Sequence, residues 1–531
     1  MKILTAAEMS ETDRRSVEAG VLVATLMENA GCAVARFCER HFSISGLVIV
    51  LCGKGNNGGD GFVAARHLGA SANIVRIVLL GKASELKGDA AVAFQALDYY
   101  DFVEAENEAD LRDALKDAVL IVDAVVGTGF KPPLRGLAAV ARAIVAKIRV
   151  PVVAVDLPSG WDADSTGEHS DEAFRADAVV TFTAPKLAHI FGHLTHTTFG
   201  AVVVADIGSP DDAVRSGANL TWAGSSKSLT EKPRDVNGNK GQFGHVLVVG
   251  GSWGKSGAPA MASVAAMRAG AGLVTAAVPA SILPMVASVA PELMCVPLAE
   301  RDGRVELANA EPQSLAKLLK GMNVVAVGPG LGTEGEASEF ARALVERCPV
   351  PMVIDADALN AFAGKTELLK AAAKSDGPRT LVLTPHPGEM ARLVGLTVKD
   401  VEADRIGIAR RFATEHGVTL VLKGWRTLIA HPDGRIAVNT TGNPSMAKGG
   451  SGDILTGIVA AMLAQYPQDV AGAVEASVFL HGLAGDFAVR AQDEHTVLAT
   501  DTVGHLWEAF RARVRDEEGF TWIAGTAMNR K

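Results

Sequence analysis

The chain has 531 residues, a formal net charge of −9, 48% hydrophobic residues and 21% charged residues. At roughly 100–200 residues per domain, the length allows about three domains or two large ones, and the ordinary composition excludes a mainly disordered chain. The acidic balance argues against a protein that coats nucleic acid. Glycine is enriched, with 55 residues, which predicts many tight turns and close backbone approaches.

The cysteines and the apolar segments indicate the compartment. Five cysteines without C-x-x-C spacing argue against both a disulfide framework and a zinc site. The uncharged run 269–291 contains two glycines and three prolines, so it predicts a buried strand, a turn and a helix rather than a membrane span. No secretory signal is visible. We therefore expect a cytoplasmic protein with no membrane or nucleic-acid partner, and we also expect it to form a homo-oligomer.

In chain order, two helices come first. The first begins with a capping box, in which Glu8 follows Thr5 by three residues, and the second runs to about Phe42. Short β-branched runs then alternate with alanine-rich segments. Apolar runs without alternation are typical of parallel strands buried on both faces, so we expect an α/β sheet with helices on both faces. The predicted strands are 47–51, Ile74–Leu80, 119–122, Val152–Val155, Ala178–Phe182 and Ala201–Ala205, and the helices between them include 89–97 and 137–148.

This rhythm stops at residues 208–241, where Gly, Ser, Asn, Pro and mixed charges dominate. We place a domain boundary near residue 225, which gives domains 1–224 and 225–531. The rhythm then resumes, and three helices are expected to close the chain by about residue 513. The second set of predicted strands is His245–Val249, 273–278, Val324–Val327, Met352–Ile354, Leu381–Leu383 and Thr419–Leu422, followed by a hairpin of 427–430 and 435–438.

The first glycine-rich loop, 52–61, follows strand 47–51. Its residues Gly53, Gly55 and Gly58 satisfy G-x-G-x-x-G, which is typical of a pyrophosphate held at a helix N-terminus. A dinucleotide fingerprint also needs an acidic residue after the second strand, and that position holds no Asp or Glu. The sequence therefore disfavours an ordinary nicotinamide-dependent dehydrogenase, and a plain tight turn is the alternative.

Polar side chains follow three of the predicted strands. These are Asn57, Asp123, Asp156 and Ser159. In an open parallel sheet, ligands bind beyond the carboxyl ends of the strands, and oxygen-bearing side chains suit a hard cation or a hydroxylated substrate. A single Asp at such a place is more often a helix cap, but three strand ends together favour a functional site.

The loops NNGGDG, Asp-x-x-x-Gly-Thr-Gly and Asp-Leu-Pro-Ser-Gly resemble those of the NAD(P)HX epimerase family over roughly residues 1–215. The resemblance implies a Rossmann-like three-layer α/β/α domain that interconverts the R and S hydrates of NADH and NADPH, called NADHX and NADPHX. It implies Asp156 as the acid/base and a K⁺ ion at Asn57, Asp123 and Ser159. A non-catalytic module of the same fold is the alternative. The implied substrate positions are Asn56, Asn57, Gly58, Gly59, Asp60, Gly127, Thr128, Gly129, Phe130, Lys131, Pro132, Pro133 and Asp156.

The most informative motif of the second half is GGSGD at 449–453, which opens a helix. Gly449, Gly450 and Gly452 free backbone N–H groups to face an anion, and the helix dipole adds about half a positive charge. Asp453 in the first turn is placed to accept a proton from a hydroxyl that attacks a phosphate, or it only stabilises the helix N-terminus. The loop 250–257 is one residue too short for a P-loop. His386, between two prolines, is either a rigid turn or a substrate contact.

The motifs GGSWGKSGAP, GPGLG, DADALN, TPHPGE and NPSMAKGGSGD, in this order, resemble ADP-dependent NAD(P)HX dehydratases of the ribokinase-like superfamily, over roughly residues 228–510. The resemblance implies a ribokinase-like α/β domain that uses ADP with Mg²⁺, releases AMP and phosphate, and has Asp453 as its base. A ribokinase-like vitamin or sugar kinase with a non-catalytic N-terminal module is the alternative. The implied substrate positions are Ala258, Gly330, His386 and Asp453, and the implied nucleotide positions are Lys423, Gly424, Trp425, Arg426, Thr427 and Gly452.

Overall fold

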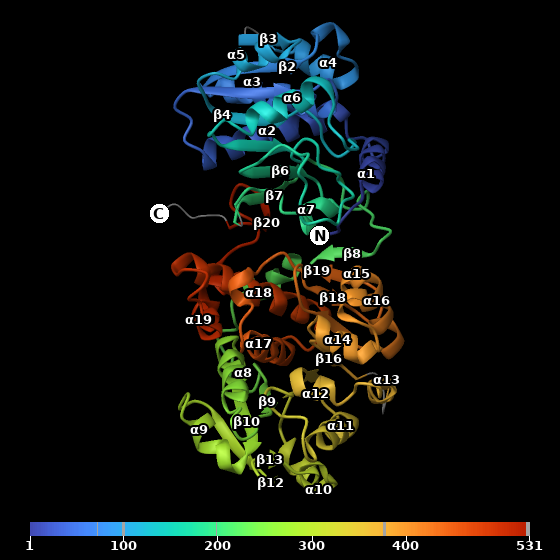
Figure 1. Cartoon of the computed structure of the whole chain (residues 1–531), viewed down its shortest axis with the longest axis vertical. Coiled ribbons are helices and arrows are strands. Elements are labelled where there is room, and N and C mark those ends of the chain that lie inside the picture. The colour runs from blue at the N-terminus through green and yellow to red at the C-terminus, as the bar shows by residue number, and fades with distance from the viewer. Residues whose placement is uncertain (72, 98–100, 198, 375–378, 527–531) are drawn as a thin grey trace. The chain divides into compact units, whose positions relative to one another are not determined.

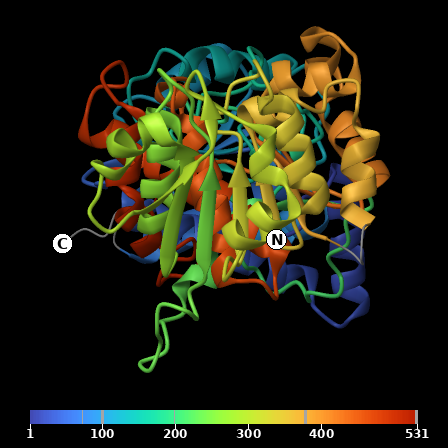
Figure 2. The ribbon, with the colours of Figure 1, turned by 90° about the horizontal axis from the view of Figure 1, so that it is seen from below.

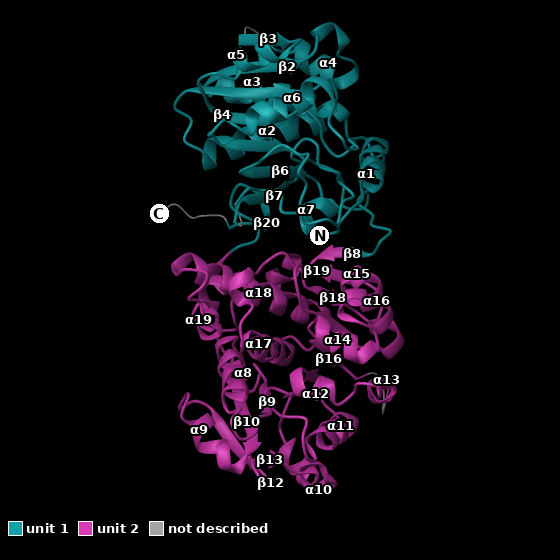
Figure 3. Ribbon diagram, in the orientation of Figure 1, with its two compact units in different colours: residues 1–220, 513–531 teal, residues 221–512 magenta. Residues whose placement is uncertain are grey.

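The computed structural model describes residues 1–526 except 72, 98–100, 198 and 375–378 (Figure 1). The chain divides into two compact units, residues 1–220 with 513–531 and residues 221–512 (Figure 3). Each unit contains a mainly parallel β-sheet with helices packed against it, which confirms the predicted α/β class.

The first unit contains an eight-stranded sheet in the order β20-β7-β6-β5-β4-β1-β2-β3. All neighbouring strands are parallel except β20, which is antiparallel to β7. The strand order reverses between β1 and β4, and such a switch point is where open α/β sheets bind ligands. The strands are β1 (Leu47–Cys52), β2 (Ile74–Leu80), β3 (Asp101–Ala105), β4 (Ala118–Ala124), β5 (Val152–Val155), β6 (Ala178–Phe182), β7 (Ala201–Ala205) and β20 (Thr521–Ala524).

Helices cover both faces of this sheet. Val48 and Val50 of β1 belong to the core under α2 and α3, whereas Ile49 and Leu51 belong to the core under α5 and α6. This alternation follows from the two-residue period of a strand, and burial of both faces explains why the predicted strands are apolar throughout. Both hydrogen bonds of the predicted capping box of α1 are present. The helices are α1 (Ala6–Glu18), α2 (Val23–His41), α3 (Asn56–Ala70), α4 (Gly88–Gln95), α5 (Glu108–Ala114), α6 (Gly136–Val145) and α7 (Leu187–Phe191).

The second unit contains a ten-stranded sheet in the order β11-β10-β9-β14-β15-β16-β17-β18-β19-β8, and Figure 2 shows its strands side by side among the helices. The strands from β11 to β17 are parallel, and β18 and β19 form the predicted antiparallel hairpin. The strands are β8 (Leu220–Trp222), β9 (His245–Val249), β10 (Leu273–Pro279), β11 (Met294–Leu298), β14 (Val324–Val327), β15 (Met352–Ile354), β16 (Leu381–Leu383), β17 (Thr419–Leu422), β18 (Leu428–Ala430) and β19 (Ile436–Val438), with a separate pair of β12 (Glu300–Arg301) and β13 (Arg304–Val305).

Within this unit α17 and α8 pack against each other and against β9. Four helices rather than the predicted three follow the hairpin within the described residues, because the last predicted helix is interrupted at His505. The helices are α8 (Gly257–Arg268), α9 (Leu283–Ala287), α10 (Pro312–Leu318), α11 (Ala337–Arg347), α12 (Ala356–Asn360), α13 (Glu367–Lys374), α14 (Pro387–Val394), α15 (Val398–Ala403), α16 (Arg405–His416), α17 (Ser451–Gln465), α18 (Val470–Ala491), α19 (Ala499–Gly504) and α20 (Leu506–Arg511).

The division of the chain differs from the predicted one in two places. The second unit begins at residue 221, because β8 joins its sheet next to β19 and the Trp222 Nε1–H donates to Thr440 Oγ1 at 2.8 Å. The segment 513–526, expected in the second domain, lies in the first unit, where β20 pairs with β7. Phe520 and Trp522 of this segment are buried in the core of that unit.

The uncharged run 269–291 forms β10, a short 3₁₀ turn and α9, as predicted. No helix among the described residues is long and apolar enough to span a bilayer.

Candidate functional site

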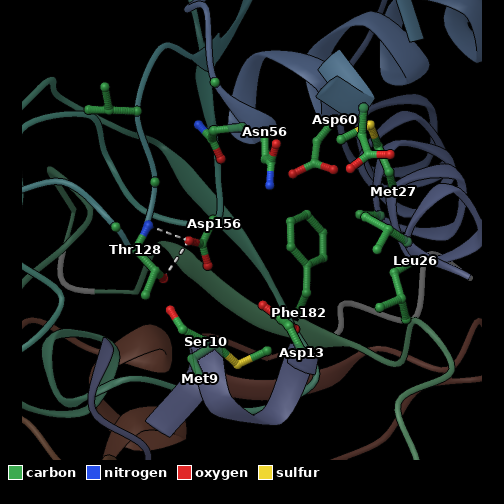
Figure 4. A pocket seen from close by; sticks show the side chains of 18 of the residues that line it. Met9, Ser10, Asp13, Leu26, Met27, Asn56, Asp60, Thr128, Asp156 and Phe182 are labelled. Atoms are coloured by element: carbon green, nitrogen blue, oxygen red, sulfur yellow. Dashed lines mark hydrogen bonds between the residues drawn. The ribbon is translucent and has the colours of Figure 1, made fainter. Parts of the chain in front are cut away.

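A cavity of about 830 Å³ in the first unit lies at the carboxyl ends of β1, β4 and β5, beside the switch point of the sheet. Figure 4 shows that side chains from α1, α2, α3 and the strand ends surround it. The cavity therefore brings together residues from three of the predicted loops. The predicted site residues that line it are Asn56, Asn57, Asp60, Gly127, Thr128, Gly129, Phe130 and Asp156.

Asp156 follows β5 in a left-handed backbone conformation, with φ at +65°. Its Oδ1 accepts hydrogen bonds from Lys186 Nζ at 2.9 Å and from Thr181 Oγ1 at 2.8 Å, and its Oδ2 accepts two from Thr128, at 2.7 Å from N and 2.5 Å from Oγ1. Burial alone would raise the pKa of Asp156, but the charge of Lys186 and these donors hold it well below its usual range. Asp156 is therefore an ionised carboxylate at neutral pH.

The backbone of Asp156 is held by His189. The carbonyl oxygen of Asp156 lies 2.7 Å from His189 Nε2, and the backbone N of Lys186 lies 3.0 Å from His189 Nδ1. Burial and the charge of Lys186 lower the pKa of His189 to about 4, so the ring is neutral. A neutral ring with its proton on Nε2 donates to the carbonyl and accepts from the amide, which satisfies both contacts.

Asp60 on α3 points into the same cavity (Figure 4). Its carboxyl makes no hydrogen bond or ion pair with any residue that the structure describes. Burial, followed by the negative charges of Asp156 and Asp13, raises the pKa of Asp60 well above its ordinary value. The carboxyl groups of Asp156 and Asp60 are thus driven in opposite directions, Asp156 toward the ionised form and Asp60 toward the protonated form.

The three predicted K⁺ ligands lie around the loop 125–127. Asp123 accepts hydrogen bonds from Ser159, at 2.8 Å from N and 2.6 Å from Oγ, and burial raises its pKa to about 6 against these bonds. Ser159 Oγ also accepts from Val126 N at 2.9 Å. A Cβ at Gly127 would lie 2.8 Å from Asn57 Oδ1 and 2.9 Å from Asp156 Oδ2. A larger residue at this position would therefore clash with both side chains. The buried Asn57 Nδ2 has no partner among the described residues.

Some of the predicted positions lie outside the cavity. Gly58 and Gly59 are buried in α3, and Lys131 forms exposed ion pairs with Asp162 and Asp164 at 2.8 Å. Pro132 and Pro133 are also outside the lining.

The cavity also contains residues that the sequence did not indicate. Lys186 is one of them, although a polar residue shortly after β6 follows the same pattern as Asp156 after β5. Sequence analysis also missed the residues of α1, which reach the cavity only through tertiary packing. The missed lining residues include Met9, Ser10, Asp13, Phe182 and Lys186.

A second cavity, of about 770 Å³, lies in the second unit beyond β15, β16 and β17 and at the start of α17. It brings together segments from four predicted motifs that are far apart in the chain. The predicted residues that line it are His386, Lys423, Gly424, Trp425, Arg426, Thr427, Gly449, Gly450, Gly452 and Asp453.

Lys423 connects the strand ends of this cavity. Its Nζ lies 3.0 Å from Asp355 Oδ1 and 3.8 Å from Glu389 Oε2, and Thr456 Oγ1 donates to Asp355 Oδ2 at 2.6 Å. Although burial opposes its charge, the carboxylates of Asp355 and Glu389 raise the pKa of Lys423. A Cβ at Gly452 would lie only 3.3 Å from Lys423 Nζ. A charged ammonium therefore lies beside the glycine loop, where an anion would be attracted.

Asp453 lies in the first turn of α17, which is preceded by Gly450 at a φ of +98°. Burial, followed by the negative charge of Asp355, raises the pKa of Asp453 to about 6, and the positive charge of Lys423 opposes this shift. A base with a pKa close to neutral can both accept and release a proton under cellular conditions. This arrangement suits proton transfer as well as stabilisation of the helix.

His386 has a structural role as the first residue before α14. Its Nδ1 accepts from Gly388 N at 3.0 Å, and its backbone N–H donates to Glu389 Oε2 at 2.8 Å, which together form a capping box. This confirms the rigid turn between the two prolines. Because His386 also lines the cavity, substrate contact stays a prediction.

Ala258 and Gly330 lie next to each other outside the lining of this cavity, since a Cβ at Gly330 would lie 3.0 Å from that of Ala258. Sequence analysis assigned no role to Asp355, although its motif was noted. It also missed His481, which lines the cavity from α18. A histidine within a long helix has no motif that could have indicated this.

The fold and the two cavities define a protein of two α/β units, each with a ligand-sized cavity beyond the carboxyl ends of its strands. Residues 23–188 match the family model described as YjeF-related protein N-terminus, and residues 246–506 match the model described as NAD(P)H-hydrate dehydratase. The sequence is 41% identical to the bifunctional NAD(P)H-hydrate repair enzyme Nnr of Moorella thermoacetica, in a match that covers 99% of each chain. It is 34% identical to that of Escherichia coli, over 94% of this chain and 92% of the relative.

Among solved structures, the ADP/ATP-dependent NAD(P)H-hydrate dehydratase of Bacillus subtilis, co-crystallised with ATP/Mg²⁺, is 32% identical with a TM-score of 0.48, and the match covers 55% of this chain and 98% of that one. The chain belongs to the family of bifunctional NAD(P)H-hydrate repair enzymes. The relatives match both units, so a kinase with a non-catalytic N-terminal module is not favoured. The cytoplasmic location and the homo-oligomer stay predictions.

Proposed function

We propose that the first unit interconverts the R and S epimers of NADHX and NADPHX in the cavity that contains Asp156. The observation that carries this proposal is the ionised, fourfold hydrogen-bonded carboxylate of Asp156 at the edge of an open cavity. In the hydrate, the hydroxyl-bearing ring carbon is bonded to the ring nitrogen, so loss of the hydroxyl leaves a ring cation. A fixed carboxylate stabilises such a charge where it develops.

The second unit dehydrates the S epimer with ADP and releases AMP and phosphate. Asp453 accepts the proton of the substrate hydroxyl while the hydroxyl oxygen attacks the terminal phosphorus of ADP. Lys423 and the N–H groups of the glycine loop face the phosphate and oppose its growing negative charge. Phosphate is a better leaving group than hydroxide, so it departs with the C–O electron pair, and loss of a proton from the neighbouring ring carbon restores the dihydropyridine.

Two cations fit this scheme. In the first unit, K⁺ would be held by Asn57, Asp123 and Ser159. The buried Asp123 forms no ion pair with a residue that the structure describes, and oxygen ligands suit such an ion. K⁺ would supply the positive charge that this carboxylate lacks. In the second unit, the described residues contain no cluster of three or more His, Cys, Asp or Glu that could hold a metal. Mg²⁺ would therefore enter with the phosphates of ADP, as this ion commonly does, and neutralise part of their charge.

The test is incubation of a mixture of R- and S-NADHX with ADP, followed by the absorbance of reduced nicotinamide. We expect the wild type to convert both epimers completely to NADH. The Asp156→Ala variant should convert the S fraction at the normal rate and the R fraction only at the rate of spontaneous epimerisation. A stable phosphorylated product without NADH would contradict the dehydratase proposal.

A further inference from the structure

The geometry points to Asp60, rather than Asp156, as the residue that transfers a proton to and from the hydrate in the first unit. This inference rests on the epimerase function proposed above, which it deepens by moving to Asp60 the acid/base role that the family resemblance implied for Asp156. Asp60 would be the general acid and base, whereas Asp156 would stabilise the ring cation.

The contacts of Asp156 leave it poorly suited to carry a proton. Each of its two oxygens accepts two hydrogen bonds, from Lys186 and Thr181 on one side and from Thr128 on the other. A carboxylate has about four acceptor positions, so all of them are occupied. Protonation of Asp156 would break at least one of these bonds and leave the buried ammonium of Lys186 without its counter-charge.

Asp60 has the opposite surroundings. Its carboxyl has no hydrogen-bond partner among the described residues and faces the cavity, where Figure 4 shows it on α3, away from the strand end that bears Asp156. Asp60 is half-buried, and a carboxyl that is largely shielded from water and has no donor favours its protonated form, because the ionised form would be poorly solvated. In the cavity, a substrate hydroxyl is a natural partner for that proton.

The charged groups around Asp60 come from several elements of the first unit. The carboxylates of Asp156 and Asp13 favour the protonated form of Asp60, and the ammonium of Lys186 opposes it. On α2, Glu28 is bound to Arg66 and His67 of α3, so its charge is largely compensated. The other charged groups that line the cavity are Asp156 beyond β5, Lys186 before α7, Asp13 and Arg14 on α1, Lys54 before α3 and Asp89 on α4.

The resulting reaction balances without a co-reactant. Asp60 gives its proton to the hydroxyl oxygen, the carbon–oxygen bond breaks, and its electron pair leaves with the oxygen as water. The lone pair of the ring nitrogen forms a nitrogen–carbon double bond, and the positive charge of the ring is opposed by Asp156. A water molecule then adds to the other face of the carbon and returns one proton to Asp60 through solvent in the cavity. The carbon is inverted, and the enzyme is restored.

The experiment uses the full-length protein and R-NADHX without ADP, and it follows the appearance of the S epimer by chromatography between pH 5 and 9. Because the reaction requires protonated Asp60, kcat/KM of the wild type should fall as the pH rises through the pKa of this residue. The isosteric Asp60→Asn variant cannot donate a carboxyl proton, so we expect kcat to fall by about 10²–10⁴-fold and the pH dependence to disappear. Asp60→Glu should keep the falling limb and part of the rate.

Two control variants and two further measurements complete the design. Asp13→Asn removes another carboxyl that faces the cavity and should keep the falling limb of the pH profile. Asp113→Asn, on the exposed surface of α5, should behave as wild type. NADH titration of Asp60→Asn tests whether the cavity still binds a nucleotide, and ADP-dependent dehydration of S-NADHX tests the second unit.

The outcomes are separable. If Asp60→Asn binds NADH and keeps the wild-type rate and pH profile, or if Asp13→Asn rather than Asp60→Asn removes the falling limb, Asp60 is not the proton-transferring group. If the wild type itself forms the S epimer no faster than buffer does, the epimerase proposal fails instead.

Discussion

Lys186 Nζ lies 2.9 Å from Asp156 Oδ1, and the side chains are only 2% and 10% exposed. The pair links the residue before α7 to the end of β5, and Lys186 also donates to Thr181 Oγ1 at 2.8 Å. Burying two opposite charges costs several kcal/mol per ion, which their attraction and hydrogen bonds only just repay. The ion pair therefore adds little net stability, and its role is to hold the Asp156 carboxylate at the cavity in one orientation.

Replacing Lys186 by Met should leave the Asp156 carboxylate buried and unpaired. We expect the unfolding free energy of the first unit to fall by roughly 3–5 kcal/mol and epimerisation to be largely lost, since the carboxylate would take up a proton. Urea unfolding and R-to-S conversion measure these effects. The double variant Lys186→Met with Asp156→Asn should regain much of the stability but none of the activity. Equal stability of Lys186→Met and wild type would show that the ion pair is not the constraint on Asp156.

Asp453→Asn should remove the base of the second unit. We expect ADP-dependent dehydration of S-NADHX to slow by about 10²–10⁴-fold, while epimerisation in the first unit continues at the wild-type rate. In the wild type, the ionised form of Asp453 is the active one and its pKa is about 6. The rate should therefore rise as the pH rises through about 6 and level off above it. A variant that keeps the wild-type rate would mean that Asp453 only stabilises the start of α17.

The K⁺ proposal predicts a cation dependence confined to the first unit's reaction. When KCl is replaced by tetramethylammonium chloride at constant ionic strength, R-to-S conversion should fall severalfold, because the Asp123 carboxylate loses its counter-charge and loop 125–127 loses a support. Ser159→Ala removes one proposed ligand and should raise the K⁺ concentration needed for half-maximal rate. The proposal is wrong if the wild-type rate does not respond to K⁺.

Most strands could be predicted because their signal is local. Val152–Val155 and Met352–Ile354, for example, are short β-branched runs buried on both faces, and the structure has them with the predicted bounds. β3 was missed because its sequence, DFVEA, is mixed and its residues are partly exposed. β8 and β20 were missed because strands of three and four residues at sheet edges depend on a partner that is distant in the chain.

The residues of the candidate sites also divide into those with a local sequence signal and those whose position depends on distant parts of the chain. Asp156 and Asp453 could be found because a turn or a glycine loop at a strand end marks them. Lys186 follows a strand in the same way but was not assigned, and Asp13 could not be assigned, since its place in the cavity depends on the packing of α1. The direction of a pKa shift is even less visible in sequence. Asp60 and Asp156 are the same residue type at the same cavity, and only their hydrogen-bond partners and neighbouring charges separate their protonation states.

The segment 513–526 contributes two aromatic side chains, Phe520 and Trp522, to the core of the first unit. Trp522 of β20 packs near Phe37 with ring centroids 6.2 Å apart, and its indole N–H donates to Asp516 Oδ2 at 2.8 Å. Trp522→Ala should therefore destabilise the first unit by roughly 3–5 kcal/mol and lower epimerisation at 37 °C, while the dehydratase keeps its rate. Trp507→Ala is the matched control, because Trp507 is 57% exposed on α20 of the second unit. A chain ending at Ala512 should lose epimerisation altogether and keep dehydration. Loss of dehydration instead, with epimerisation intact, would assign the segment to the second unit, as the sequence had indicated.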